Sequence, residues 1–225
     1  MKHKKFMDIE RLNTNFVEGF RTGDEIYIEE KIDGANAAIR YDSETDTVIC
    51  QSRKKILDEE NNLRGFYEWG QTLDKGKIKE HQKAMKSRVE KLVRPAQSLS
   101  EWEKEKYVHD FICQNVHYDK LKKAYSHEII GPLGQGVGVC EGIAKAVKVL
   151  LDALGVWCVI AICGNNPEKG IKYRHTWNIV RIGGAYYHLD TTFDNTLGKS
   201  DKVEDIRYDY FNLDDGHIFK DHEPL

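Results

Sequence analysis

Two strand-like runs, at residues 174–182 and 185–190, are separated by two glycines alone. A Gly-Gly loop of two residues is a strong signal for a β-hairpin, and so short a turn fixes the register of the two strands. The register pairs Trp177 with Asp190, and it leaves His175 two residues further along on the same face. Diagonal neighbours of this kind have Cα atoms about 7–8 Å apart, which side chains can span. The hairpin therefore predicts that an imidazole and a carboxylate lie within reach of each other.

Other interpretations of the hairpin stay open at this point. His188 is a second histidine on it, but the same register sets His188 opposite Ile179, further from the Trp177 end. His175 could also be an ordinary strand histidine at a sheet edge, and Asp190 an ordinary turn aspartate. We rank His175 before His188 as the histidine that Asp190 would orient.

A cysteine stands at the expected start of a helix. Glycines at 136, 138 and 142 surround Cys140, and residues 141–154 have the apolar spacing of a helix that Gly155 ends. Unpaired backbone N–H groups and the positive end of the helix dipole meet at such a first turn, and both favour thiolate over thiol. The same N–H groups can stabilise an oxyanion. The apolar face of this helix consists of Ile143, Val147, Leu150, Leu151 and Leu154.

The other four cysteines fit a structural role. A free cysteine is usually a small buried apolar residue. Cys50, Cys113, Cys158 and Cys163 lie in or beside apolar segments, and none of them has the glycine-rich approach and helix start that Cys140 has. Cys140 is therefore the candidate nucleophile. A thiol becomes a good nucleophile when a base takes its proton, and the base works best when a third group holds its ring.

Three segments resemble the motifs of the transglutaminase-like superfamily, whose core is papain-like. They are GPLGQGVGVCEG at 131–142, HTWNIV at 175–180 and YHLDTTFD at 187–194. The last of these has threonine and phenylalanine where proline and tryptophan are more usual in the family. The tail at 210–222 resembles the closing segment of bacterial members. The resemblance runs from about residue 85 to the C-terminus.

The resemblance implies a role for each residue of the set. Cys140 would be the nucleophile, His175 the base and Asp190 the acid that orients it. Apart from the resemblance, we expect the backbone amide of Cys140 to help hold the oxyanion, with Gln135 as a candidate side-chain donor. The family includes cross-linking acyltransferases, peptidases, amidases and members without activity, and the motifs do not choose among them.

A second resemblance concerns the first 70 residues. Lys31-Ile32-Asp33-Gly34 follows one strand-like run and precedes another, and it resembles the first motif of ATP-dependent RNA and DNA ligases. Segments at 52–54 and 63–68 resemble the next part of RNA ligases. On this resemblance Lys31 would carry the adenylate and Arg53 would lie near the nucleotide. The later ligase motifs are missing, so the segment could be a nucleotide-binding fragment, a scaffold or a relic, and Lys-Ile-Asp-Gly alone fits a simple hairpin with an Asp-Gly turn.

The order of elements predicts an α+β protein. We expect a β-rich, RNA-ligase-like fragment at 1–72, a helical linker at 73–99 and a transglutaminase-like domain at 100–225, in which the cysteine helix packs on an antiparallel sheet. Residues 75–93 read as a basic helix that Pro95 ends. Ser100 and Glu103 form a capping box that opens the next helix. The buried stripe expected on that helix consists of Trp102, Val108, Phe111, Ile112 and Val116.

Composition narrows the class of protein. The chain of 225 residues is 40% apolar and 32% charged, with a net charge of −3. Its pI of about 6.3 gives no general basic field, so nucleic acid is not expected as a partner. No apolar run approaches the roughly 18 residues of a membrane span, and the N-terminus lacks the apolar stretch of a secretory signal. Five cysteines without a Cys-x-x-Cys pair argue against a disulfide framework and a zinc cluster.

Together these patterns predict a cytoplasmic cysteine enzyme that acts on amide or peptide bonds through an acyl-thioester, as a protease, an amidase or an acyltransferase. Its expected partner is a protein or peptide substrate, and we expect no metal and no cofactor. The alternatives are a ligase-like nucleotidyltransferase or nucleotide-binding protein that uses Lys31, and a non-catalytic binding module with the papain-like shape.

Overall fold

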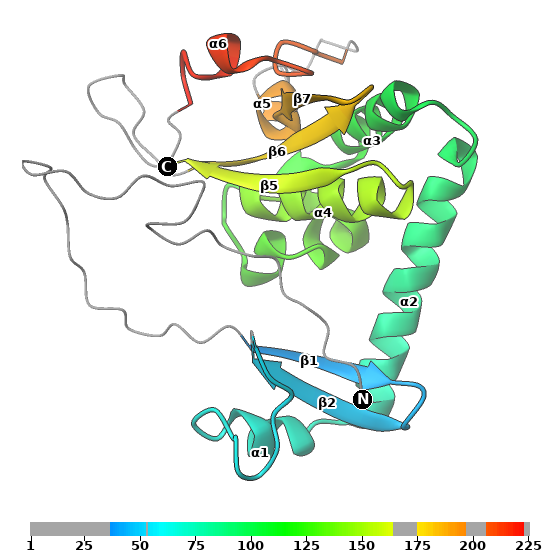
Figure 1. Ribbon diagram of the computed structural model, residues 1–225, viewed down its shortest axis with the longest axis vertical. Coiled ribbons are helices and arrows are strands. Elements are labelled where there is room, and N and C mark those ends of the chain that lie inside the picture. Colours follow the sequence, from blue (N-terminus) through cyan, green and yellow to red (C-terminus); the bar gives the residue numbers. More distant parts are fainter. Residues whose placement is uncertain (1–36, 53, 164–174, 197–205, 223–225) are drawn as a thin grey trace, which may run out of the picture. The chain divides into compact units, whose positions relative to one another are not determined.

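The computed structural model describes residues 37–52, 54–163, 175–196 and 206–222, and the chain folds into two compact units, residues 1–83 and 84–225 (Figure 1). Lys31 and Arg53, the two residues that carry the ligase resemblance, lie outside the described residues. The finer division of the chain at residues 72 and 99 stays a prediction.

The described part of the first unit is a β-hairpin with one short helix packed on it. Strands β1 (Ala37–Asp42) and β2 (Thr47–Ser52) are antiparallel, and Asp42 pairs with Thr47 at the turn between them. Helix α1 (Phe66–Gln71) packs on β2. The packing is close, because a Cβ atom added to Gly70 would lie 2.2 Å from the sulfur of Cys50.

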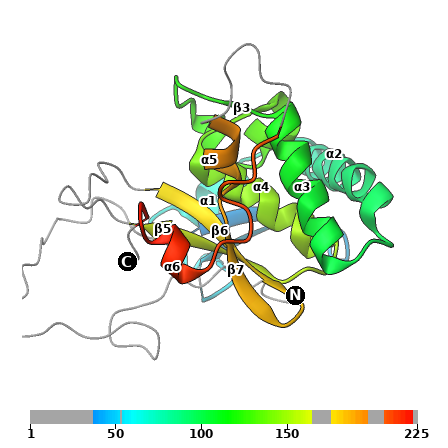
Figure 2. The same cartoon turned by 90° about the horizontal axis from the view of Figure 1, so that it is seen from above.

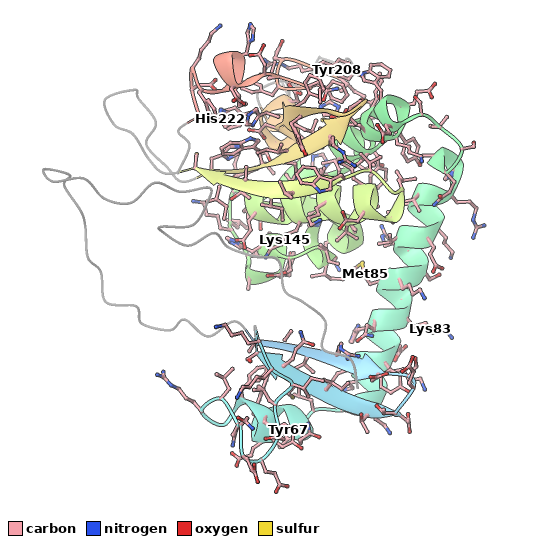
Figure 3. All side chains as sticks on the ribbon, in the orientation of Figure 1. Tyr67, Lys83, Met85, Lys145, Tyr208 and His222 are labelled. Carbon is pink, nitrogen blue, oxygen red and sulfur yellow. The ribbon has the colours of Figure 1, made fainter. Side chains whose placement is uncertain are left out.

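Helix α2 (Lys75–Val93) is the predicted basic helix, and a 3₁₀ turn at Arg94–Ala96 ends it at Pro95 as expected. The division between the two units falls within α2, between Lys83 and Ala84. In the second unit its apolar side chains pack on the core of that unit, from Met85, labelled in Figure 3, to Val93.

Helix α3 (Glu101–Asn115) begins at the predicted capping box: the hydroxyl of Ser100 accepts from the amide of Glu103, and the Glu103 carboxylate accepts from the amide of Ser100. The expected stripe is wrong at one position, because Trp102 is 48% exposed. Trp102 lies in the first turn, at the end of the core, where its ring packs edge-on against Phe211. Two polar residues, Glu105 and His109, are fully buried on this helix instead.

A looped segment leads from α3 to the cysteine helix. It contains the two-residue strands β3 (His117–Tyr118) and β4 (Val137–Gly138), which pair in parallel. A 3₁₀ turn at Ala124–His127 and a π-helical turn at Gly131–Gln135 lie between the two strands. Helix α4 (Cys140–Ala153) follows and buries the predicted apolar face.

The sheet of the second unit has the order β5-β6-β7 and is antiparallel throughout. Its strands are β5 (Cys158–Cys163), β6 (His175–Ile182) and β7 (Ala185–Leu189). Helix α4 lies on one side of the sheet and helix α6 (Asp215–Ile218) on the other (Figures 1 and 2). The core is formed mainly by α3, α4 and the facing residues of the sheet: Val108, Ile112, Val116, Ile143, Ala146, Val147, Leu150, Leu151, Leu154, Val156, Val180 and Leu189. The fold is therefore α+β, as predicted.

Helix α5 (Thr191–Thr196) follows β7 directly and packs on α3 and α4. The Asn195 amide donates to the carbonyls of Ile112 and Val116 at the end of α3, at 3.2 and 2.8 Å. The segment 206–222, here called the C-terminal segment, pairs with the end of β7. His188 and Leu213 exchange two backbone hydrogen bonds, at 2.8 and 3.0 Å.

Glu105 ties the C-terminal segment to α3. Its Oε2 atom accepts from the side-chain amide of Asn212 at 2.9 Å, whereas Oε1 has no partner among the described residues. Burial raises the pKa of Glu105 to about 8, although the hydrogen bond from Asn212 opposes the shift. An apolar environment disfavours the ionised form of a carboxyl group. Glu105 is therefore a buried carboxyl that folding keeps protonated near neutral pH.

Among the described residues, every helix is too short or too polar to cross a lipid bilayer.

Candidate active site

Cys140 is the first residue of α4, and its side chain is half-buried. The preceding residue, Val139, is extended and its side chain makes no cap, so the backbone N–H groups of the first turn are not used by a capping side chain. The backbone N–H groups of Glu141 and Thr176 lie near enough to the sulfur to lower the pKa of the thiol. The position predicted from the sequence, a thiol at a helix start, is the observed one.

A buried carboxylate shapes the loop that precedes the cysteine helix. Asp119 accepts from the hydroxyl of Ser126 at 2.5 Å and from the amide of Lys123 at 2.9 Å. The carbonyl of Ser126 in turn accepts from the amide of Val139 at 3.0 Å. A Cβ atom added to Gly142 would lie 2.1 Å from that carbonyl oxygen. Gly142 is thus needed for the close approach of the loop to the first turn of α4.

His175 is the first residue of β6, and its ring is bound to Asp190. The Nε2 atom of His175 lies 2.5 Å from Oδ2 of Asp190. Because Nε2 is engaged, Nδ1 is the ring nitrogen left for the thiol, and the thiol and the ring each shift the pKa of the other. The ring of Phe193 packs against the His175 ring, with centroids 4.5 Å apart. The predicted hairpin register is confirmed, since Ile179 pairs with His188.

Asp190 follows β7 and is completely buried. Its Oδ1 atom accepts from the amides of Thr192 and Phe193 at 3.0 and 3.1 Å, so Asp190 caps helix α5. Its Oδ2 atom accepts from His175 and also from Nε2 of His222, at 2.9 Å. Four donors therefore satisfy the carboxylate, which is the condition for burying a charged group at acceptable cost.

Burial opposes every charge in this site, and the neighbouring charges outweigh it. Burial raises the pKa of Asp190, but His175 and His222 together hold that pKa below its usual range. Burial lowers the pKa of His175, but Asp190 and the thiol raise it to about 10. Burial raises the pKa of the Cys140 thiol, yet His175 and the two backbone N–H groups bring that pKa below its usual range. The arrangement favours a thiolate beside an imidazolium, which is the reactive form of a cysteine nucleophile.

The two other predicted site residues that the structure describes, His188 and Gln135, make no hydrogen bond to Cys140. The rival histidine, His188, is buried and points away from the thiol: its Nδ1 atom accepts from the Trp177 indole at 2.9 Å, and its Nε2 atom donates to Asp215 at 2.9 Å. Gln135 is exposed at the end of the π-helical turn, and within the described ranges no hydrogen bond joins it to Cys140. Its role as an oxyanion donor stays a prediction, as does the role of Lys31.

The other four cysteines are buried, as predicted. Burial raises the pKa of Cys158 to about 12, and burial also raises the pKa of Cys50. A thiol with a raised pKa is inert at neutral pH, because the thiolate is the reactive form. Cys140 differs from both, since its pKa is shifted downward.

Comparison with known families identifies part of the chain. Residues 86–191 match the model of the transglutaminase-like superfamily. These residues form a transglutaminase-like domain. The match includes Cys140, His175 and Asp190, and it confirms the resemblance that the three motifs indicated. The ligase resemblance of the first 70 residues stays a prediction.

Two solved structures are similar to the chain. One is a crystal structure of a TGase, with 14% sequence identity and a TM-score of 0.46 over 76% of this chain and 47% of that one. The other is a candidate cysteine protease from Cytophaga hutchinsonii, with 22% identity and a TM-score of 0.37 over 46% of this chain and 37% of that one. The chain thus spans less than half the length of either protein. Comparison with curated proteins gave no match.

One group of described residues has the composition of a metal site. Ligand atoms of His175, Asp190 and His222 all lie within 4.8 Å of one another. However, the two ring nitrogens lie 2.5 and 2.9 Å from the same carboxylate oxygen. Two ligands of a tetrahedral zinc ion, each about 2.0–2.1 Å from the metal, would be about 3.3 Å apart. The observed distances fit shared protons better than a metal ion.

Sequence reasoning missed several residues that build this site. His222 stands in the tail motif, but its contact with Asp190 spans 32 positions, beyond the reach of any local pattern. The support from Asp119 and Ser126 carries no periodic signal. His109 joins α3 to α5 through a 3.0 Å contact with Asp194, and the apolar periodicity of its helix does not indicate this contact. The Asp-His pair at the end of the tail, within a segment that already resembled the family, was the available clue for His222.

Proposed function

We propose that the transglutaminase-like domain is a cysteine enzyme that cleaves an amide or peptide bond through an acyl-thioester on Cys140. The observation that supports the proposal most directly is the 2.5 Å contact between Nε2 of His175 and Asp190, which leaves Nδ1 for the thiol. A cysteine, an imidazole and an orienting carboxylate in this order of contact are the parts that acyl transfer by a thiol requires.

The reaction follows from the ion pair. The thiolate of Cys140 attacks the carbonyl carbon of the substrate, and the carbonyl oxygen becomes an oxyanion. The C–N bond then breaks as the imidazolium of His175 gives its proton to the leaving amine, and a thioester remains. Water or a second amine, deprotonated by the now neutral His175, attacks the thioester. The thiolate leaves, the acyl group departs as an acid or a new amide, and the ion pair is restored.

The first turn of α4 is the place for the oxyanion. Backbone N–H groups at a helix N-terminus have no intrahelical partners, and donors fixed before the reaction stabilise a developing charge without reorganisation. The amide of Cys140 is the nearest such donor to the reacting sulfur by covalent connection. Gln135 remains the proposed second donor, and its exposed side chain would have to move toward the substrate to act.

The substrate that we propose is a protein or peptide. A half-buried thiol on a domain surface can meet a carboxamide side chain or an extended backbone. Hydrolysis and transfer to an amine share every step up to the thioester, so the same residues serve a protease, an amidase and an acyltransferase. A reducing compartment such as the cytoplasm would keep the thiol unpaired.

Two measurements test the proposal. The first is brief alkylation with substoichiometric iodoacetamide at neutral pH, followed by peptide mapping. Cys140 should be labelled first in the wild type and should lose this preference in His175→Ala, whereas the exposed-site control His217→Ala should behave as the wild type. Preferential labelling of Cys50, Cys113, Cys158 or Cys163 would exclude Cys140 as the nucleophile.

The second measurement traps the acyl group. A glutamine-containing peptide is incubated with the protein and hydroxylamine, and the hydroxamate or the free acid is identified by mass spectrometry. Release of either product that is absent in Cys140→Ala and retained in Cys50→Ala supports the proposal, and the ratio of the two products separates hydrolysis from transfer. Inert Cys140 and no product from a panel of amide and peptide substrates would favour a non-catalytic binding module.

A further inference from the structure

His222 is buried against the site although it comes from the C-terminal segment. Its side chain is 1% exposed, and Figure 3 labels it beside the start of β6. Its Nε2 atom lies 2.9 Å from Oδ2 of Asp190, and its Nδ1 atom lies 2.6 Å from Oδ1 of Asp221. The ring of Trp177 packs edge-on against it, with centroids 4.9 Å apart. The ring is therefore held between two carboxyl groups.

The hydrogen bonds of His222 indicate its charge. An ionised carboxylate can only accept, and a histidine ring donates from both nitrogens only when it is doubly protonated. Asp190 accepts from two amides and from His175, as an ionised carboxylate does. It has no proton to donate, so the Nε2 atom of His222 must be the donor in their contact. Asp221 also acts as an acceptor, because the hydroxyl of Tyr210 donates to its other oxygen. Both ring nitrogens of His222 thus face acceptors, which the imidazolium alone satisfies.

Other titratable groups, from the neighbouring elements, face His222 and Asp190. The His175 ring of β6 lies 5.3 Å from the His222 ring, and the Tyr210 ring of the C-terminal segment lies 5.7 Å from it. Asp194 of α5 is close enough to Asp190 for the charge of Asp190 to raise the pKa of Asp194. Carboxylates on both sides offset the positive charge of His222. His175 carries a charge of the same sign, and the Oδ2 oxygen of Asp190 lies between the two rings.

We propose that His222 is a positioning residue whose imidazolium keeps Oδ2 of Asp190 ionised and directed at His175. The inference rests on the proposed function, because it concerns how the histidine that activates Cys140 is itself held. His222 makes its contact with Asp190 and not with the reacting sulfur, so it acts through the carboxylate. The C-terminal segment, in this view, supplies the outer end of a set of hydrogen bonds that runs from His175 through Asp190 and His222 to Asp221.

The first test follows the rate of Cys140 alkylation by iodoacetamide from pH 4 to pH 8. An opposite charge within a few ångströms lowers a carboxyl pKa by about 1–3 units. Loss of the His222 charge should therefore move the acid limb, the fall in alkylation rate at low pH, to a midpoint about one pH unit higher. His222→Phe should also lower the plateau of this profile, the alkylation rate above the acid limb, about tenfold. His222→Gln keeps a neutral donor, so it should recover most of the plateau while its acid limb stays displaced.

Two further variants sharpen this comparison. Asp221→Asn removes the outer charge that favours the imidazolium, and its acid limb should move in the same direction by a smaller amount. His217→Gln alters an exposed histidine of the same segment and should leave both limb and plateau in place. A purely structural role would lower the melting temperature and the plateau in the His222 variants without moving the limb. An acid limb at the wild-type pH in both His222 variants overturns the proposal.

A second readout does not depend on reactivity. Nitrogen-15 NMR of the histidine rings, assigned with His222→Gln, reports directly whether each ring nitrogen carries a proton. His222 should have protons on both nitrogens in the folded protein, and a neutral ring would overturn the proposal even in an active protein. A doubly protonated His222 together with an inert Cys140 would instead contradict the proposed function alone.

Discussion

Replacing Glu105 by glutamine should change how the stability of the protein depends on pH. Glu105 has a pKa of about 8 in the folded protein against 4.5 for a free side chain, because it is buried. Between these two values the folded state holds a proton that the unfolded state releases, so rising pH favours unfolding. Glutamine cannot ionise, and its carbonyl can still accept from Asn212. The variant should therefore escape this loss of stability.

The magnitude follows from the width of the pH range. One pKa unit corresponds to about 1.4 kcal/mol, so between pH 5 and pH 7 the free energy of unfolding of the wild type should fall relative to Glu105→Gln by about 3 kcal/mol. Below pH 4.5 the difference should be constant, and above pH 8 it should level off. Any fixed cost of burying the new amide hydrogens shifts the whole curve and does not alter its slope.

Urea unfolding at a series of pH values, followed by tryptophan fluorescence, measures this difference. Three tryptophans, Trp102, Trp157 and Trp177, lie in the unit that contains Glu105. Glu103→Gln is the matched control on the same helix. Hydrogen bonds from Ser100 hold the pKa of Glu103 below its usual range, so the control should give a flat difference from pH 5 to pH 8. A flat difference for Glu105→Gln as well would refute the reasoning.

Three further outcomes are expected. Gly142→Ala should lower the melting temperature and slow alkylation of Cys140, because the added carbon would lie 2.1 Å from the carbonyl oxygen of Ser126; unchanged values in calorimetry and peptide mapping would contradict the close approach. Asp190→Asn should slow alkylation of Cys140 at pH 7 at least tenfold. It should also lower the free energy of unfolding in urea by about 3–5 kcal/mol, because it leaves a buried imidazolium unpaired. An unchanged alkylation rate would show that the carboxylate does not sustain the ion pair. Lys31→Ala should leave alkylation of Cys140 unchanged, and ATP with magnesium should not raise the melting temperature of the parent, since a ligand stabilises only a state that it binds; a rise that the variant loses would indicate a nucleotide site.

The parts of the site that sequence alone could predict depend on local signals. The two-glycine turn sets the hairpin register, and the register relates His175 to Asp190. The glycines and the apolar spacing around Cys140 locate a helix start to within one residue. Both signals act over fewer than 20 positions, so turn chemistry and periodicity are sufficient to read them.

The parts that could not be predicted depend on contacts between distant segments. His222 reaches Asp190 across 32 positions, and no pattern in the chain specifies how the C-terminal segment runs over the sheet. Glu105 is a related case, because a charged residue in a helix is normally read as exposed. Tertiary packing placed Glu105 inside and Trp102 partly outside, which an apolar pattern along one helix could not reveal.

The position of His222 in the chain has a consequence for biosynthesis. A ribosome makes the chain from the N-terminus, so Cys140, His175 and Asp190 all emerge before the segment that carries His222. Until that segment has been made and has docked on the sheet, Oδ2 of Asp190 lacks one of its two donors. In a nascent polypeptide the contact between His175 and Asp190 would therefore form before the carboxylate has its full set of donors.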